Sequence, residues 1–141
     1  MKTKFDSILK LKKQALDKSE VEIIKNNQMI VAKTTELDLA MFEFNKFDIP
    51  QNGTYLDFQR FTEIKKALMY EIDCIRGEIS GLKNISKRLE EYRKIANIEF
   101  EKIKYLQQNE IKKKFDVLKK SEIKHIDEVA LMLFASDKER V

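Results

Sequence analysis

Apolar residues recur every seven positions along two stretches of the chain, which are separated by a segment that holds the only proline. The first row is Leu9, Leu16, Ile23, Ile30, Leu37 and Phe44, and the second is Phe61, Leu68, Ile75, Leu82, Leu89, Ala96 and Ile103. A sustained seven-residue spacing is typical of helices that pack along one seam as a coiled coil. The pattern predicts two long helices, over about residues 4–48 and 55–134.

The segment between the two stretches predicts a turn over residues 49–54. Pro50 cannot continue a helix, and Gly53 suits the positive φ of a tight turn. Thr54 and Asp57 have the spacing of a capping box, which marks the start of a helix. The chain is therefore expected to fold back on itself at this point.

Folding the chain about residues 51–53 pairs the two apolar rows in order, with Ile30 opposite Ile75 and Leu37 opposite Leu68. One register satisfies six layers, as an antiparallel coiled coil requires. The sequence thus predicts an all-α fold, a long two-helix antiparallel coiled-coil hairpin that forms a single domain over residues 1–141.

A second row of each helix carries polar residues in its middle part. Lys12, Lys33, Lys65 and Arg93 are expected to lie along the seam and extend their charges into water. Asn26 is expected to fix the register of the two helices, because a buried polar residue favours one alignment over its neighbours.

The second predicted helix is much longer than the first, so its part from residue 103 to residue 134 has no internal partner. Its apolar residues follow a slower period there, with several residues eleven positions apart, and such a period relaxes a left-handed supercoil. An uncovered apolar stripe predicts docking of a partner through Ile111, Phe115, Leu118, Ile126 and Val129. Residues 135–141 are expected to form a short polar tail outside the helix.

The start of the second helix is rich in aromatic residues. Tyr55, Phe58, Phe61 and Ile64 step by three, which winds the stripe around the helix faster than one seam covers it. Phe61 and Leu68 have seam partners, whereas part of the stripe should remain exposed. Exposed apolar patches mark interaction surfaces, so this region is a candidate interface.

Composition favours a long-helix protein whose charges are solvated. The chain is 37% charged with a net charge of +4, and acidic and basic residues alternate along it. This interleaving argues against nucleic acid as a partner. The single cysteine, Cys74, excludes an internal disulfide and is expected to be a small core residue. With no apolar stretch of membrane-spanning length, the expectation is a soluble cytoplasmic protein.

No constellation of residues predicts catalysis, a cofactor or a metal. The sequence lacks a glycine-rich phosphate loop and a cluster of cysteine and histidine. Glu122 and His125 have the E-x-x-H spacing of di-iron bundles, but those proteins use two copies of the motif. The chain is expected not to be an enzyme.

Four strings in this order and spacing resemble the FliJ family of coiled-coil proteins in the bacterial flagellar type III export apparatus. They are Phe5–Lys13, Tyr55–Phe61, Glu101–Leu106 and Ile126–Ala130. The resemblance covers nearly the whole chain, and the unequal hairpin and the closing I-D-E-V-A string are its most specific parts.

The resemblance implies a non-enzymatic, stalk-like protein whose partners are a hexameric export ATPase, the export-gate membrane protein and export chaperones. It implies a cytoplasmic location, peripheral at the inner face of the membrane. In the family, apolar residues near the start of the second helix are thought to meet the export gate, which points to Tyr55, Phe58, Phe61, Ile64 and Leu68. Alternatives are a structural coiled-coil scaffold, the equivalent stalk of a virulence secretion system, or a basic nucleic-acid binder.

Overall fold

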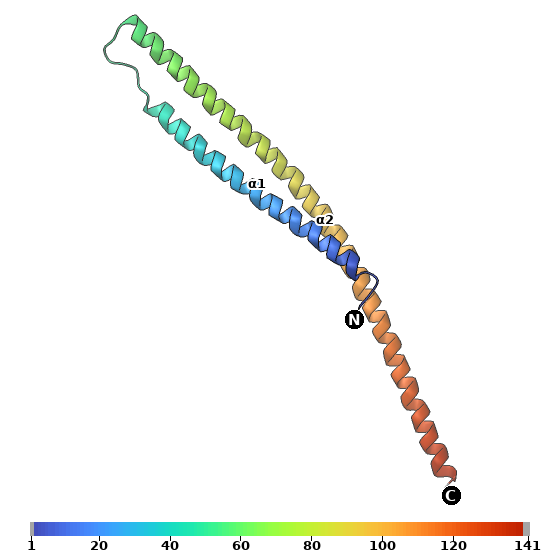
Figure 1. The fold of residues 1–141 in the computed structure, drawn as a ribbon. Coiled ribbons are helices and arrows are strands. Elements are labelled where there is room, and N and C mark those ends of the chain that lie inside the picture. Colours follow the sequence, from blue (N-terminus) through green and yellow to red (C-terminus); the bar gives the residue numbers. More distant parts are fainter. Residues whose placement is uncertain (1, 140–141) are drawn as a thin grey trace. The chain divides into compact units, whose positions relative to one another are not determined.

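The computed structural model describes residues 2–139, which form two helices, α1 (Asp6–Lys46) and α2 (Tyr55–Glu139) (Figure 1). This confirms the predicted all-α hairpin. By their contacts, the described residues divide into two units, one from residues 2–14 and 97–139 and the other from residues 15–96. Both helices run through both units, and the single domain stays a prediction.

Both helices begin at capping boxes, and that of α2 is the predicted one. The Thr3 amide donates to Asp6 Oδ2 at 3.1 Å, and the Thr3 hydroxyl donates to Asp6 Oδ1 at 2.7 Å. The Thr54 amide donates to Asp57 Oδ2 at 3.0 Å, and the Asp57 amide donates to the Thr54 hydroxyl at 3.4 Å. The caps satisfy amides that the first helical turn leaves without a partner, which is why the helices start here.

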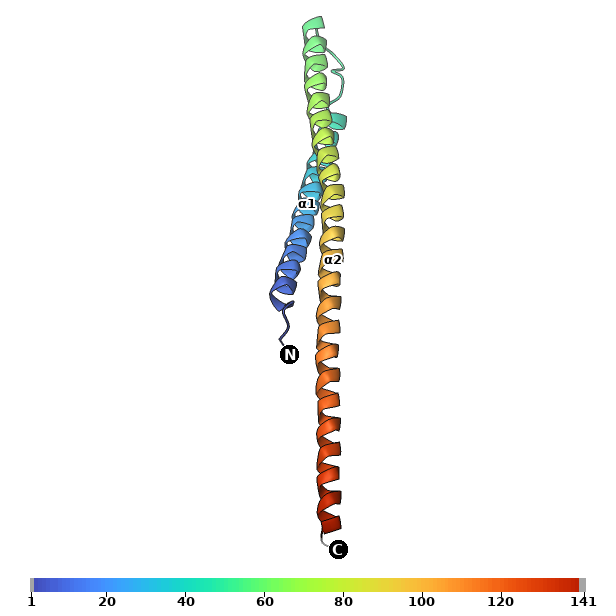
Figure 2. The ribbon, with the colours of Figure 1, turned by 90° about the vertical axis from the view of Figure 1, so that its right-hand side faces the viewer.

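The connection between the helices is longer than the predicted tight turn. It covers residues 47–54, because α1 already ends at Lys46, and no residue of the described chain has a positive φ. Gly53 instead lies close to the cap of α2, because a Cβ there would lie 3.0 Å from Asp57 Oδ2, the oxygen that caps the helix. The first turns of α2 lie beyond the last turn of α1, and the loop runs back along them (Figures 1 and 2).

The core of the second unit is formed by Ala40 of α1 and by Ile72, Ile75 and Ile79 of α2, which are only 2–8% exposed. The half-buried Leu37 and Phe44 pack against this cluster. In the predicted register, the three isoleucines would instead lie against residues 26–33. The predicted pairing of Ile30 with Ile75 is therefore wrong.

These contacts fit a register that is displaced by about one heptad, which sets Leu37 near Ile75 and Ala40 near Ile72. The same displacement explains the ion pair between Lys33 and Glu78. A heptad pattern repeats after seven residues, so the displaced register still places apolar residues opposite one another. It also matches Ile72 with an alanine rather than with a lysine.

Lys65 of α2 contacts the C-terminal end of α1. Its Nζ donates a hydrogen bond to the carbonyl oxygen of Phe44, in the last turn of α1, and lies 3.9 Å from the centroid of the Phe44 ring. A cation at a helix C-terminus satisfies carbonyls that have no partner within the helix. The expectation that Lys65 extends into water is therefore wrong.

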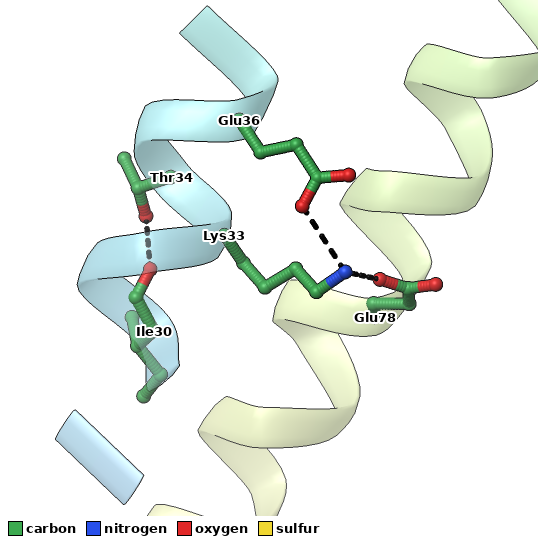
Figure 3. A network of polar contacts seen from close by, with 5 residues as sticks. All are labelled: Ile30, Lys33, Thr34, Glu36 and Glu78. Carbon is green, nitrogen blue, oxygen red and sulfur yellow. Dashed lines mark hydrogen bonds and ion pairs between the residues drawn. The ribbon is translucent and has the colours of Figure 1, made fainter. Parts of the chain in front are cut away.

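The other charged seam residues also have carboxylate partners instead of reaching only into water. Lys33 lies 2.6 Å from Glu78 of α2 and 3.1 Å from Glu36 of α1, and these contacts raise the pKa of Lys33, that with Glu78 most (Figure 3). Lys12 of α1 pairs with Glu99 of α2 at 2.7 Å, and Arg93 pairs with Glu90 of the same helix at 3.1 Å. Such half-exposed pairs add little stability, but the two that join the helices, Lys33–Glu78 and Lys12–Glu99, favour one alignment of α1 and α2.

Asn26 is 6% exposed, and its side-chain amide donates to the carbonyl oxygen of Leu82 at 3.0 Å. A buried amide without a partner would be costly, so this bond favours the alignment that makes it. The bond is what a register-fixing residue needs, and the register role itself stays a prediction. Ser19 is equally buried, and its hydroxyl has no partner.

Three further predictions differ from the structure. Residues 135–139 belong to α2, because the sequence there contains neither glycine nor proline, while residues 140–141 of the predicted tail lie outside the described residues. Cys74 is exposed rather than part of the core. Phe47 stacks on Phe61, with ring centroids 5.2 Å apart, whereas the predicted order of the two rows pairs Phe61 with Phe44. Over the described residues, neither helix contains an apolar stretch of the length that a membrane crossing needs.

Candidate partner-binding surfaces

The start of α2 presents apolar side chains to solvent. Tyr55 is 82% exposed, Phe58 41% and Ile64 45%, and we call these three residues the α2-start patch. They are exposed because the first turns of α2 precede Lys65 and so lie past the end of α1. Phe61 and Leu68, the two residues with predicted seam partners, are half-buried.

The aromatic stripe divides between two faces of the helix. Tyr55 and Phe58 border a shallow groove along α2, together with Gln59 and Lys66. Phe61 and Ile64 border a second hollow, which the loop lines with Phe47, Asp48, Pro50 and Asn52. The structure thus separates residues that the sequence grouped into one contact, as expected from steps of three residues.

The C-terminal part of α2 is exposed along its whole described length from residue 112 to residue 137. Of the predicted docking residues, Phe115, Leu118, Ile126 and Val129 are between 41% and 65% exposed, while Ile111 is half-buried. The amino group of Lys114 donates to the carbonyl oxygen of Lys2 at 3.1 Å, so N-terminal residues reach this far along α2.

Sequence reasoning missed several apolar residues of this segment. Val117, Ile123 and the consecutive residues Leu131, Met132, Leu133 and Phe134 are 52–70% exposed. Four apolar residues in a row cannot all lie on one helix face, and that run was the signal in the sequence. The C-terminal segment therefore exposes apolar side chains on more than one face.

The outer side of α1 carries a third apolar area. Ile24 is 57% exposed and Val31 65%, and with Asn27 and Gln28 they line a shallow groove. Leu39 and Phe42 are also exposed farther along the helix. These residues lie off the seam, because the seam side of α1 is covered by α2 and they are exposed.

The described residues contain no arrangement that suggests chemistry. No group of three or more histidine, cysteine or acidic residues within them has the geometry of a metal site, and Glu122 and His125 stand without further ligands. The exposed Cys74 lies against Tyr70 one turn earlier, and their hydrogen bond raises the pKa of the Tyr70 hydroxyl. The candidate functional features of the described residues are therefore the exposed apolar surfaces.

Comparison with known proteins gives a match at the level of a family. The model of the family described as "Flagellar FliJ protein" matches residues 1–139, which is nearly the whole chain. Searches of the curated proteins and of the solved structures returned no match.

Proposed function

Because this chain belongs to the FliJ family, a non-catalytic component of the flagellar export apparatus, we propose that it acts there as a stalk-like coiled coil. Its partners are the hexameric export ATPase, the export-gate membrane protein and the export chaperones. They hold it peripherally at the inner face of the cytoplasmic membrane. The family match carries this proposal, and its flagellar description favours flagellar export over a virulence secretion system.

The C-terminal segment of α2 is the part that binds the ATPase in this proposal. It is the longest stretch of helix that α1 leaves uncovered, and Phe115, Leu118 and Ile126 present apolar side chains at helical spacing. A helix with one apolar stripe is suited to insertion into a groove or between subunits of a ring. The six lysines of residues 112–124 would add attraction to an acidic surface.

The test is ATP turnover by the cognate flagellar ATPase, with and without this protein. We expect the wild type to raise turnover or to promote hexamer formation, and Leu118→Asp to lose most of that effect. Val117→Asp is the matched control, because Val117 is 67% exposed and lies outside the apolar stripe, about 100° around the helix from Leu118. An ATPase that does not respond to the wild type would contradict the proposal.

The α2-start patch binds the export gate in this proposal. Tyr55 and Phe58 on one face of the first turns of α2, and Ile64 on another, are exposed apolar side chains. Aromatic side chains that are exposed together commonly anchor protein interfaces. The patch and the ATPase-binding segment share no residue, so the proposal assigns the two partners to different surfaces.

Double substitution Tyr55→Ala and Ile64→Ala should weaken binding to the cytoplasmic domain of the gate protein and reduce motility. Helix content and ATPase stimulation should be unchanged, since neither residue belongs to the core. Tyr92→Ala, which removes a 65% exposed tyrosine elsewhere on α2, serves as the control. Normal gate binding by the double variant would place the contact elsewhere.

A further inference from the structure

The exposed C-terminal segment carries a stripe whose spacing is the same in both directions. The stripe, here called the 111–133 stripe, consists of Ile111, Phe115, Leu118, Glu122, Ile126, Val129 and Leu133. Its steps are 4, 3, 4, 4, 3 and 4 residues, with Glu122 at the centre. At about 100° per residue, all seven positions fall within an arc of roughly 80° on the helix surface.

Most of this stripe faces solvent. Phe115 and Ile126 are 63% and 65% exposed, and Leu133 is 64% exposed. Only Ile111, at one end, is half-buried. Helices gain most of their stability by packing an apolar face, so a face of this kind calls for a partner helix.

The palindromic spacing makes the stripe complementary to itself in the antiparallel direction. With two copies aligned about Glu122, Leu118 of one lies opposite Ile126 of the other, and Phe115 lies opposite Val129. Ile111 then lies opposite Leu133. Six of the seven layers are apolar, and only the central layer brings two carboxylates together.

The charge distribution favours the antiparallel over the parallel direction. Residues 112–120 contain five lysines and one aspartate, whereas residues 123–133 contain one lysine with Asp127 and Glu128. A parallel pair would set the lysine-rich halves side by side. An antiparallel pair sets each lysine-rich half along the half with the acidic residues, for example Lys114 near Glu128 of the second copy.

We propose that two copies of this chain pair antiparallel through the 111–133 stripe, with Glu122 of each at the two-fold axis. Such an interface uses the same surface on both copies. The two central carboxylates repel each other, so the pairing is reversible. The pairing concerns the chain alone and does not depend on the proposed function. Where that function holds, pairing covers the surface that binds the ATPase and so competes with it.

Molecular mass from light scattering or sedimentation, measured over a range of concentrations, tests the pairing. The wild type should move from 16.7 kDa toward twice this mass as concentration rises. Glu122→Leu should tighten the dimer about tenfold or more, because it removes the central carboxylates. Leu118→Asp should remain a monomer, and Val117→Asp should behave as the wild type does.

Disulfide formation tests the direction in a Cys74→Ser background. Mixing Phe115→Cys with Val129→Cys should yield a mixed disulfide dimer on mild oxidation, whereas Phe115→Cys alone should yield little. Three outcomes would overturn the proposal. They are a Glu122→Leu variant that is monomeric at all concentrations, a dimer that Leu118→Asp leaves intact, and efficient crosslinking of Phe115→Cys to itself.

Discussion

Two parts of the same helix α2 show what pairing does to otherwise similar residues. Between Ile72 and Ile79, the seam isoleucines are 2–8% exposed, because α1 covers them. In the 111–133 stripe, the apolar residues from Phe115 onward have the same chemistry and a comparable spacing, but they are 41–65% exposed. Burial in this chain thus follows from the presence of a second helix, and the covered and uncovered parts differ little in composition.

Polar seam residues also have different surroundings in the two parts. In the covered part, Asn26 donates to the Leu82 carbonyl, and Lys33 pairs with Glu78. In the uncovered part, Glu122 interrupts the apolar stripe and is exposed. A polar residue in a seam limits which partners and alignments are acceptable. Glu122 therefore restricts which helix can pack on the C-terminal segment, just as Asn26 restricts how α1 packs on α2.

The largest expected effect is an all-or-none crosslink that reports the register of the covered part. In a Cys74→Ser background, the pair Leu37→Cys and Ile75→Cys should form a disulfide on oxidation. The pair Leu37→Cys and Leu68→Cys should not, because the displaced register sets those positions one heptad apart. Gel mobility with and without reductant reads out both. Crosslinking of the second pair alone would restore the register expected from the sequence.

Next in size is the substitution of a covered isoleucine by aspartate. Ile72→Asp places a charge at a position that is 2% exposed, where it has no partner, and should cost more than about 3 kcal/mol of unfolding free energy. Ile126→Asp makes the same change at a 65% exposed position and is the matched control. Urea unfolding followed by circular dichroism measures the unfolding free energy of both variants. Equal losses of unfolding free energy would mean that Ile72 is no more buried by α1 than Ile126 is.

The register was the part of the fold that the sequence could not determine. Moving one helix by seven residues leaves Leu37 and Ile30 facing apolar residues, so the periodic pattern accepts both alignments. What distinguishes them is local: the early end of α1 at Lys46 and the bond from Lys65 to the Phe44 carbonyl. The sequence predicts a tight turn at Gly53, whereas the structure has an eight-residue loop.

The all-α hairpin and the capping box of α2 were predicted correctly, because they depend on local chemistry and on spacing. Cys74 was placed in the core because it adjoins Ile75, although neighbouring residues lie about 100° apart on a helix. For the candidate surfaces, the sequence indicated exposed residues at the start of α2 and along its C-terminal segment. It gave no means of dividing the aromatic stripe between two grooves, because that division depends on the path of the loop.

A smaller effect is expected at the buried amide of the covered part. Asn26→Ala removes the hydrogen bond to the Leu82 carbonyl and leaves a small void, which should cost about 1–2 kcal/mol. Asn27→Ala, at the exposed neighbouring position, should change the unfolding free energy by less than about 0.5 kcal/mol. Chemical unfolding of both variants measures the difference. Equal stability would mean that Asn26 does not help to hold the hairpin.

Alanine substitution should raise the stability of the protein at Gly77 and Gly81 and lower it at Gly53. A Cβ at Gly77 or Gly81 would meet no atom within 4 Å, so alanine at either position should add about 0.5–1 kcal/mol of helix stability. Gly53→Ala should destabilise the start of α2, because its Cβ would crowd the Asp57 carboxylate that caps the helix. Thermal unfolding by circular dichroism compares the three. A loss of stability at Gly77 would indicate a close contact on that face.

The smallest effect concerns pH at the cap of α1. Hydrogen bonds from Gln107 and then from Thr3 lower the pKa of Asp6. A lowered pKa means that the folded state favours the carboxylate. The cap's contribution is therefore complete above the ordinary aspartate pKa of about 3.9, and it is lost as pH falls through the lowered value.

The Asp6 carboxyl resonance, followed by NMR as pH is reduced from about 6 to 2, should titrate below the ordinary aspartate range. Gln107→Ala removes the bond of 2.8 Å from the Gln107 amide and should move that midpoint upward. Gln108→Ala, at the exposed next position, should leave it in place. A midpoint that is the same in the Gln107 variant and the wild type would show that Gln107 does not hold the N-terminal turn of α1 against α2 within this unit.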